Sequence, residues 1–298
     1  MGANGTNAGG AIGGMGASSL TQARRRRFLI ESLLNERGEV CDDGGAGAGI
    51  EIPPDREPAA QRSLLRALMN VRPPRAASPG FLEVQDDYLQ GELTARGVTD
   101  IDDLSPVRPG IYLWQGDITT LRCDAIVNAA NSGMTGCYVP NHRCIDNAIH
   151  TYAGVQLRLT CAEVMRRQGR PEPTGGAKIT PAFNLPCRYV LHTVGPVVAE
   201  SGRVTPRDRE LLASCYRSCL RLAAEHGLGS VAFCCISTGE FRFPNEEAAE
   251  IAVRTVVDFL RNARTGAKAD TKPSVTKVVF DVFKDADREI YARLLGEL

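Results

Sequence analysis

Residues 231–253 read VAFCCISTGEFRFPNEEAAEIAV, an apolar run followed by a polar loop and then by a helical pattern. The run over 231–236 is short and rich in β-branched and aromatic side chains, which is typical of a buried strand. Asn245 stands before two glutamates, and a capping side chain with acids in the first turn is the chemistry of a helix start. Apolar residues then recur at helical spacing. The stretch is therefore predicted to form a strand, a loop and a helix in that order.

The same alternation extends over residues 107–298, which are predicted to form one α/β domain. Strands that alternate with helices predict a mixed, mostly parallel sheet sandwiched by helices. In such sheets ligands bind on the loops at the carboxyl ends of the strands, so those loops should carry the function. Strands are expected at 111–115, 125–129, 178–183, 189–194, 231–236 and 278–283, and helices near 145–168, 207–226, 246–263 and 285–297.

The first third of the chain differs from the rest in composition and in its pattern of apolar residues. Residues 1–19 are mostly Gly, Ala, Asn and Ser, and they are predicted to be a disordered Gly-rich leader. Residues 20–106 carry amphipathic patterns around 28–34, 64–69 and 81–96, which predict a small all-helical N-terminal extension. No cluster of titratable residues in this extension indicates chemistry.

Composition limits the classes of partner. The 298 residues contain 35 Lys and Arg against 35 Asp and Glu, so the formal net charge is zero. Binding driven by nucleic-acid phosphates favours a basic excess, so no nucleic-acid partner is expected. The longest apolar runs are strand-sized, so no membrane partner is expected either. Most of the ten cysteines lie in apolar segments, as free thiols do, which predicts a cytoplasmic location.

Three loops after predicted strands carry polar groups suited to a ligand. Residues 116–119, Gly-Asp-Ile-Thr, place a carboxylate beside exposed amides, which suits an exocyclic amine, although a Gly-Asp pair is also a common turn. Asn128 and Asn131 stand at the end of the next strand, where they can bind sugar hydroxyls or cap turns. Residues 236–244 lead from a strand into a helix, and the free backbone N–H groups of such a loop favour an anion.

Together these loops resemble those of a macrodomain, the fold that binds ADP-ribose. The resemblance covers about residues 111–298 and rests on several strings in register. The matching strings are WQGDIT at 114–119, AIVNAAN at 125–131, HTVGP at 192–196 and ISTG at 236–239.

This resemblance implies how the ligand is held. Asp117 is expected to contact the adenine amine, with Ile118 also among the binding residues, and Phe283 to stack near the adenine. Asn131 is expected to contact the distal ribose. Arg242 stands where macrodomains often have Gly, and it is expected either to contact phosphate or to point to solvent. The diphosphate is expected on the backbone amides of Ser237, Thr238, Gly239, Glu240 and Phe241.

Residues 136–150, GCYVPNHRCIDNAIH, depart from the Gly-rich run that most macrodomains have at this point. Cys137, His142 and Cys144 lie within eight residues of one another. Thiolate and imidazole are the ligands that zinc prefers, and three protein ligands with one open position define a catalytic site. The same letters also fit a Cys137–Cys144 disulfide, or two unrelated thiols beside a surface histidine.

The Cys-x4-His-x-Cys pattern and the helical extension are similar to those of the zinc-dependent macrodomains, a class of microbial protein-ADP-ribosyl hydrolases. The similarity implies a zinc cofactor held by Cys137, His142 and Cys144. In MacroD-type hydrolases the matching string places an aspartate at position 146, which implies that Asp146 positions the attacking water. Asp146 also suits a helix N-cap. His150 is expected to be structural and to pack behind the loop, and His192, at a strand end, has no evident ligand role.

The resulting hypothesis is a zinc-dependent hydrolase that removes mono-ADP-ribose from modified protein side chains and so reverses protein ADP-ribosylation. The bond is expected to be an ester to Asp or Glu, with Asp146 and Asn131 as catalytic residues. The expected partners are an ADP-ribosylated protein substrate and ADP-ribose. Two alternatives remain at this stage: a reader module that binds ADP-ribose without turnover, and a redox sensor that uses Cys137 and Cys144 as an oxidisable pair.

Overall fold

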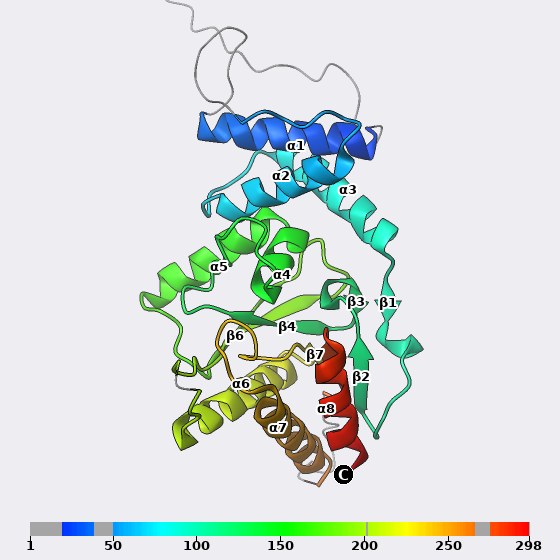
Figure 1. Ribbon diagram of the computed structural model, residues 1–298, viewed down its shortest axis with the longest axis vertical. Coiled ribbons are helices and arrows are strands. Elements are labelled where there is room, and N and C mark those ends of the chain that lie inside the picture. The colour runs from blue at the N-terminus through cyan, green and yellow to red at the C-terminus, as the bar shows by residue number, and fades with distance from the viewer. Residues whose placement is uncertain (1–19, 39–49, 201, 266–274, 298) are drawn as a thin grey trace, which may run out of the picture.

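A six-stranded sheet forms the centre of the molecule (Figure 1). The computed structural model describes residues 20–38, 50–200, 202–265 and 275–297, so the predicted leader at 1–19 lies outside the described residues. Strand β5 is antiparallel to β6, and every other pair of neighbours is parallel, which confirms the predicted mixed, mostly parallel sheet. In spatial order the strands are β2 (Ile111–Gln115), β8 (Lys277–Val282), β7 (Ser230–Phe233), β4 (Ala125–Ala130), β6 (Tyr189–Val194) and β5 (Ala177–Pro181).

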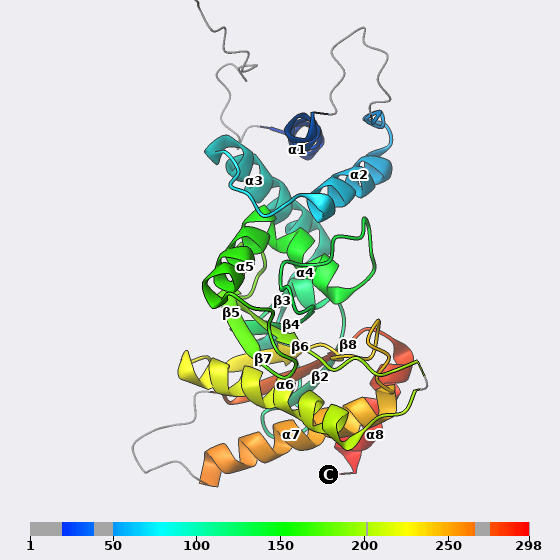
Figure 2. The same ribbon diagram turned by 90° about the vertical axis from the view of Figure 1, so that its left-hand side faces the viewer.

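Helices cover both faces of this sheet, as the alternation of elements predicts. Figures 1 and 2 show α4 (Ile145–Ala153) and α5 (Val155–Gln168) on one face. The other face carries α6 (Pro206–Glu225), α7 (Asn245–Thr265) and α8 (Asp285–Gly296). The four inner strands are almost wholly buried because apolar side chains point to both helical layers, whereas the outer strands β2 and β5 are partly exposed. No helix in the described part of the chain is both long and apolar enough to cross a membrane.

The single helix expected over 145–168 is in fact two helices that meet at Gly154. This residue has φ +97°, a conformation that side chains other than Gly rarely adopt. An added Cβ would also lie 2.6 Å from side-chain atoms of both Gln85 and Gln156. The break turns α5 away from α4 and lets the two helices cover different parts of the sheet.

The N-terminal extension is a bundle of α1 (Gln22–Arg37), α2 (Pro58–Val71) and α3 (Pro79–Arg96). Thr21 and Ser78 cap α1 and α3, because their hydroxyl groups accept hydrogen bonds from backbone N–H groups in the first turn. The bundle has an apolar core of its own, and Val155 at the start of α5 belongs to it. The extension is therefore packed directly on the helical layer that contains α4 and α5 (Figure 1).

The last part of the extension is not helical, contrary to the prediction for 20–106. Strand β1 (Thr99–Asp100) pairs in parallel with β3 (Leu121–Arg122) of the α/β domain. A two-residue strand leaves no periodic pattern in a sequence, because alternation needs four or more residues to be visible. Short 3₁₀ helices at Ile101–Asp103 and Ile118–Thr120 complete the connection.

Candidate functional site

Residues 137–144, here called the Cys/His loop, form the last part of the connection from β4 to α4. The thiol sulfur atoms of Cys137 and Cys144 and a ring nitrogen of His142 all lie within 4.8 Å of one another. The Cys137 Sγ and His142 Nδ1 atoms are 3.6 Å apart. Tetrahedral zinc with Zn–S of about 2.3 Å and Zn–N of about 2.0 Å would place its sulfur and nitrogen ligands about 3.5 Å apart. The three side chains therefore fit a zinc ion, and both cysteines are free thiols, contrary to the disulfide alternative.

Cys144 also starts helix α4. Its sulfur accepts a hydrogen bond from the backbone N–H of Asn147 at 3.4 Å, so Cys144 is the N-cap. Asp146 lies in the first turn of the helix, and the N-cap alternative for Asp146 is wrong. The helix start thus positions two groups at once: the thiol of Cys144 and, two residues later, the carboxylate of Asp146.

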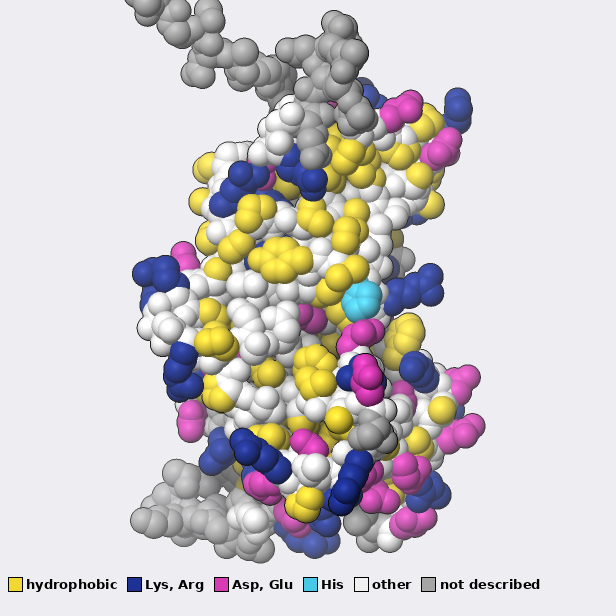
Figure 3. Space-filling model, turned by 60° about the vertical axis from the view of Figure 1, so that its left-hand side comes forward, with side chains coloured by type: hydrophobic (Ala, Val, Ile, Leu, Met, Phe, Trp, Pro, Cys, Tyr) yellow, Lys and Arg dark blue, Asp and Glu magenta, His cyan; other side chains and the backbone are white. Residues whose placement is uncertain are grey.

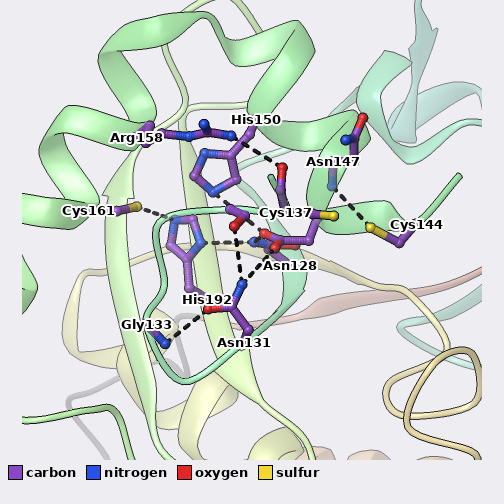
Figure 4. A network of polar contacts seen from close by, with 12 residues as sticks. Asn128, Asn131, Gly133, Cys137, Cys144, Asn147, His150, Arg158, Cys161 and His192 are labelled. Carbon is purple, nitrogen blue, oxygen red and sulfur yellow. Dashed lines mark hydrogen bonds and ion pairs between the residues drawn. The ribbon is translucent and has the colours of Figure 1, made fainter. Parts of the chain in front are cut away.

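Asp146 is buried and hydrogen-bonded to Asn128 and Asn131. Figure 4 shows these two asparagines near His192. The Oδ1 atom of Asp146 accepts a hydrogen bond from Asn128 Nδ2 at 2.8 Å, and its Oδ2 accepts one from Asn131 Nδ2 at 3.4 Å. Asn131 Nδ2 also donates to the carbonyl of Gly136, the residue before Cys137, at 3.2 Å. Burial raises the pKa of Asp146 to about 6, although the hydrogen bond from Asn128 and the charge of Arg158 act in the opposite direction. The predicted catalytic pair and the Cys/His loop therefore form one cluster.

His192 contacts this cluster through Asn128, although its sequence pattern indicates no ligand role. It lies within β6, opposite Asn128 of β4 in the sheet register, and is not at a strand end as expected. Asn128 Nδ2 lies 3.1 Å from His192 Nδ1, which must accept because the amide nitrogen can only donate. The other ring nitrogen then carries the proton and faces Thr180 Oγ1 at 2.9 Å. Burial lowers the pKa of His192 to about 4, so the ring is neutral.

His150 packs behind the Cys/His loop, as expected. An added Cβ at Gly136 would lie 2.8 Å from its ring, so Gly136 is needed for this close approach. Its Nε2 lies 3.5 Å from Asp146 Oδ1. Burial, with the charges of neighbouring groups, lowers the pKa of His150 well below its usual value, so the ring faces Asp146 in its neutral form.

The residues expected around the adenine are tied to the N-terminal extension. Asp117 Oδ1 accepts hydrogen bonds from the backbone N–H and the hydroxyl of Thr119, and its Oδ2 forms an ion pair with Arg96 of α3 at 2.8 Å. Ile118 is buried, whereas the Phe283 ring is 78% exposed at the end of β8 and free to cover a flat ligand. Close packing of Trp114 on Gly116, where an added Cβ would lie 2.2 Å from the indole, sets the turn that presents Asp117.

Residues 237–241, here called the serine loop, follow β7. Within the described chain, the backbone N–H groups of Gly239, Glu240 and Phe241 have no hydrogen-bond acceptor, so they are available to an anion. Ser237 has φ +67° and its buried hydroxyl has no partner among the described residues. Arg242 is exposed, which agrees with the expectation that it points to solvent, and its Nε and Nη2 also donate to the Val198 carbonyl at 3.4 Å.

The serine loop meets the Cys/His loop through one side-chain pair. Glu240 Oε1 lies 3.5 Å from His142 Nε2, the ring nitrogen that faces away from Cys137. A metal-ligating histidine commonly donates its other N–H to a carboxylate, which fixes the tautomer of the ring. The structure thus brings together the two loops that the sequence predicts to bind the metal and the diphosphate.

The surface around these loops is mixed in character. On the face drawn in Figure 3, apolar side chains are frequent, and Lys and Arg are interspersed with Asp and Glu. Tyr138 and Val139 of the Cys/His loop are among the exposed large apolar side chains. This face does not carry a continuous basic stripe.

The sequence prediction assigns no site role to Asn147 or His192, and it expects Asn128 to bind a sugar hydroxyl or to cap a turn. Asn128, Asn147 and His192 are almost completely buried, and all three take part in the hydrogen-bond network around Asp146 and Cys144. A polar side chain inside an otherwise apolar strand is a usable signal for Asn128, because a buried amide needs partners. The role of Asn147 depends on α2, which is distant in sequence.

The chain is similar to known proteins of one family. The sequence profile of the family described as "Macro domain" matches residues 127–252. A protein-ADP-ribose hydrolase of Treponema medium is 55% identical over 281 residues, which are 93% of this chain and 100% of that protein. A protein-ADP-ribose hydrolase of Staphylococcus aureus (strain MSSA476) is 54% identical over 90% of this chain and 95% of its own.

Solved structures show the same fold. A Trypanosoma brucei macrodomain in complex with ADP-ribose is 30% identical, with a TM-score of 0.57, over 77% of this chain and 95% of its own. A mutant Oceanobacillus iheyensis macrodomain with ADPR is 35% identical, with a TM-score of 0.55, over 65% of this chain and 96% of its own. The chain is 55% identical to the Treponema medium protein over 93% of its length. It therefore belongs to the macro domain family and groups with relatives named protein-ADP-ribose hydrolase.

Proposed function

We propose that this protein hydrolyses the bond between ADP-ribose and a modified protein side chain, and that it uses a zinc ion held by Cys137, His142 and Cys144. Two relatives more than 50% identical over most of the chain are named protein-ADP-ribose hydrolase, and similar macrodomains were solved with ADP-ribose. These relationships support the reaction class and the ligand. The zinc ion rests on the geometry of the Cys/His loop, and the identity of the linked residue is a separate part of the proposal.

One observation carries the proposal: the zinc-type donors converge next to Asp146 and Asn131. The loop that holds Cys137 accepts a hydrogen bond from Asn131 at Gly136, and the helix that begins at Cys144 carries Asp146 in its first turn. A substrate atom held by Asn131 would therefore lie between the donor set and the carboxylate. This is the arrangement needed to orient both a ribose and a water.

Bound zinc would act as a Lewis acid on an oxygen of the distal ribose and could lower the pKa of a coordinated water. The residues of the chain perform the other tasks. Asp146 accepts a hydrogen bond, and then a proton, from the attacking water, while Asn128 and Asn131 keep its carboxylate oriented. The amides of the serine loop hold the diphosphate, and this remote contact positions the scissile bond.

The linked residue is proposed to be Asp or Glu, joined through an ester. Water adds across the ester and yields ADP-ribose and a free carboxylic acid. If the sugar–oxygen bond breaks, the oxygen of the water ends on the anomeric carbon of the ribose. If the acyl–oxygen bond breaks, the oxygen of the water ends on the carboxyl group of the released side chain. Reaction in ¹⁸O-labelled water distinguishes these routes, because only acyl cleavage places the label in the released carboxylate.

The decisive experiment combines metal analysis with a single-turnover assay. We expect one zinc per chain in the wild type, release of ADP-ribose from an Asp- or Glu-linked protein, and loss of both in Cys137→Ala. Cys187→Ala removes a buried thiol outside the loop and serves as the matched control. Wild-type turnover by a metal-free Cys137→Ala protein would refute the zinc mechanism. Retention of the adduct by zinc-loaded wild type, with ADP-ribose still bound, would instead show a reader, and absence of zinc from reduced protein would favour a redox pair.

A further inference from the structure

Helix α2 of the N-terminal extension contacts the Cys/His loop directly. The guanidinium of Arg66 forms a fork: its Nε and Nη2 donate to Asn147 Oδ1 at 3.0 and 2.8 Å, and Nη2 also donates to the His142 carbonyl at 3.1 Å. Asn147 in turn donates to the Val139 carbonyl at 3.1 Å through its side chain and to Cys144 Sγ through its backbone. Through one planar group, Arg66 therefore binds the loop directly at His142 and indirectly, through Asn147, at Val139 and Cys144.

Asn70, one turn further along α2, fixes the middle of the loop. Its side chain is almost completely buried, accepts a hydrogen bond from the Asn141 backbone N–H at 3.0 Å and donates to Thr151 Oγ1 at 3.0 Å. Asn141 has φ +56°, in the left-handed region that Asn adopts more readily than most residues other than Gly. Asn70 thus fixes a left-handed turn immediately before the histidine of the donor set.

Arg158 of α5 connects the end of α2 to the first donor. Its Nη1 donates to the carbonyls of Asn70 and Arg72, and its Nη2 donates to the Cys137 carbonyl at 3.3 Å. The guanidinium also stacks on the Tyr138 ring, 4.1 Å from its centroid. Backbone groups of residues 137, 139, 141 and 142 are therefore all bound by side chains that lie outside the loop.

We propose that α2 is a brace that holds the three donors in position for the metal, with Arg66 and Asn70 as positioning residues. This inference rests on the proposed function, because it assumes that the loop binds zinc. A loop of this kind loses conformational entropy when it closes on an ion, and a loop that is ordered in advance binds more tightly for that reason. Outer groups that orient metal ligands typically change metal affinity by about 10- to 100-fold when removed.

The test uses the full-length protein and compares Arg66→Gln with Arg62→Gln. Arg62 lies one turn earlier on α2 and is exposed, so its substitution removes a charge from the same helix without touching the loop. Competition with a zinc chelator should show about 10- to 100-fold weaker zinc binding for Arg66→Gln and an unchanged affinity for Arg62→Gln. Arg66→Lys keeps the charge but cannot form the fork, so its affinity should fall between the two. Equal zinc affinities in all these proteins would overturn the brace.

A second measurement decides the proposal independently of the metal. Hydrogen exchange of chelator-treated protein should show faster exchange of the amides at 141–144 in Arg66→Gln than in wild type or Arg62→Gln, with similar exchange in the central sheet. Unchanged exchange at these amides would overturn the brace. If the wild type takes up no zinc, the metal part of the proposed function fails, while faster exchange in Arg66→Gln would still show that α2 orders the loop.

Discussion

The Cys/His loop and the serine loop face each other through His142 and Glu240, yet they are held in different ways. The serine loop is held by backbone hydrogen bonds. Arg242 N donates to the Gly239 carbonyl, Phe243 N to the Ser237 carbonyl and Val198 N to the Phe241 carbonyl, all at 2.9 Å. The Cys/His loop is held by side chains from α2, α4 and α5. A locally closed loop can be encoded by a short motif, whereas a loop held from outside depends on the complete fold. Substitutions in the two regions should therefore change different measured quantities.

Asp146→Asn should have the largest effect. It keeps the side-chain volume but removes the acceptor for a water proton, so the single-turnover rate of ADP-ribose release should fall about 10³-fold. The affinity for free ADP-ribose, measured by calorimetry, should stay within about threefold because the serine loop is unchanged. Asp258→Asn alters an exposed carboxylate on α7 and should behave like wild type. A rate within tenfold of wild type would mean that Asp146 is not the proton acceptor.

The sheet beneath both loops should be sensitive to acid through His192. Its pKa is about 4 in the folded protein and about 6.5 in an unfolded chain. Between these two pH values the unfolded state therefore binds a proton at His192 and the folded state does not. The free energy of unfolding should therefore fall by about 3 kcal/mol between pH 6.5 and 4 because of this residue alone. Denaturant titrations should show a smaller pH dependence in His192→Gln than in wild type. His226→Gln, at the exposed end of α6, should leave the wild-type curve unchanged.

Asn147→Ala should separate metal binding from nucleotide binding. It removes the acceptor for Arg66 and the donor to Val139, so zinc affinity measured by chelator competition should fall by about 10- to 100-fold. The ADP-ribose affinity of the zinc-free protein should be unaffected, and Asn35→Ala on the exposed end of α1 is the matched control. A parallel loss of both affinities would show that the two loops are not independent.

Gly195→Ala should have the smallest effect, and it should weaken ADP-ribose binding rather than zinc binding. An added Cβ would lie 2.0 Å from Ser237 Oγ and 3.0 Å from Ile236 Cγ2, so the start of the serine loop must shift. We expect a loss of about tenfold in ADP-ribose affinity, equal to about 1.4 kcal/mol, with zinc affinity unchanged. Gly80→Ala on α3 meets open space and should change neither quantity. Unchanged ADP-ribose affinity would place the diphosphate elsewhere.

The same contrast explains what could be predicted from the sequence. The parallel strands, the serine loop and the Cys/His spacing are short-range patterns, and the structure contains each of them within a few residues of its expected position. The extension was expected to lack chemistry because Arg66 and Asn70 form no cluster along the chain. Their partners at 141, 142 and 147 lie more than 70 residues away, and only tertiary packing reveals the contact.

The ion pair of Arg96 with Asp117 gives the extension a second contact with the α/β domain, away from the Cys/His loop. The three-helix extension therefore contacts both Asp117, which is expected to bind the adenine, and the Cys/His loop, which is expected to bind the metal. A substitution on either side of this interface is therefore expected to disturb residues on the other side. Residues 137–144 grafted alone onto a macrodomain that lacks these helices are accordingly expected to bind zinc more weakly than in this chain, because the side chains that order the loop would be missing.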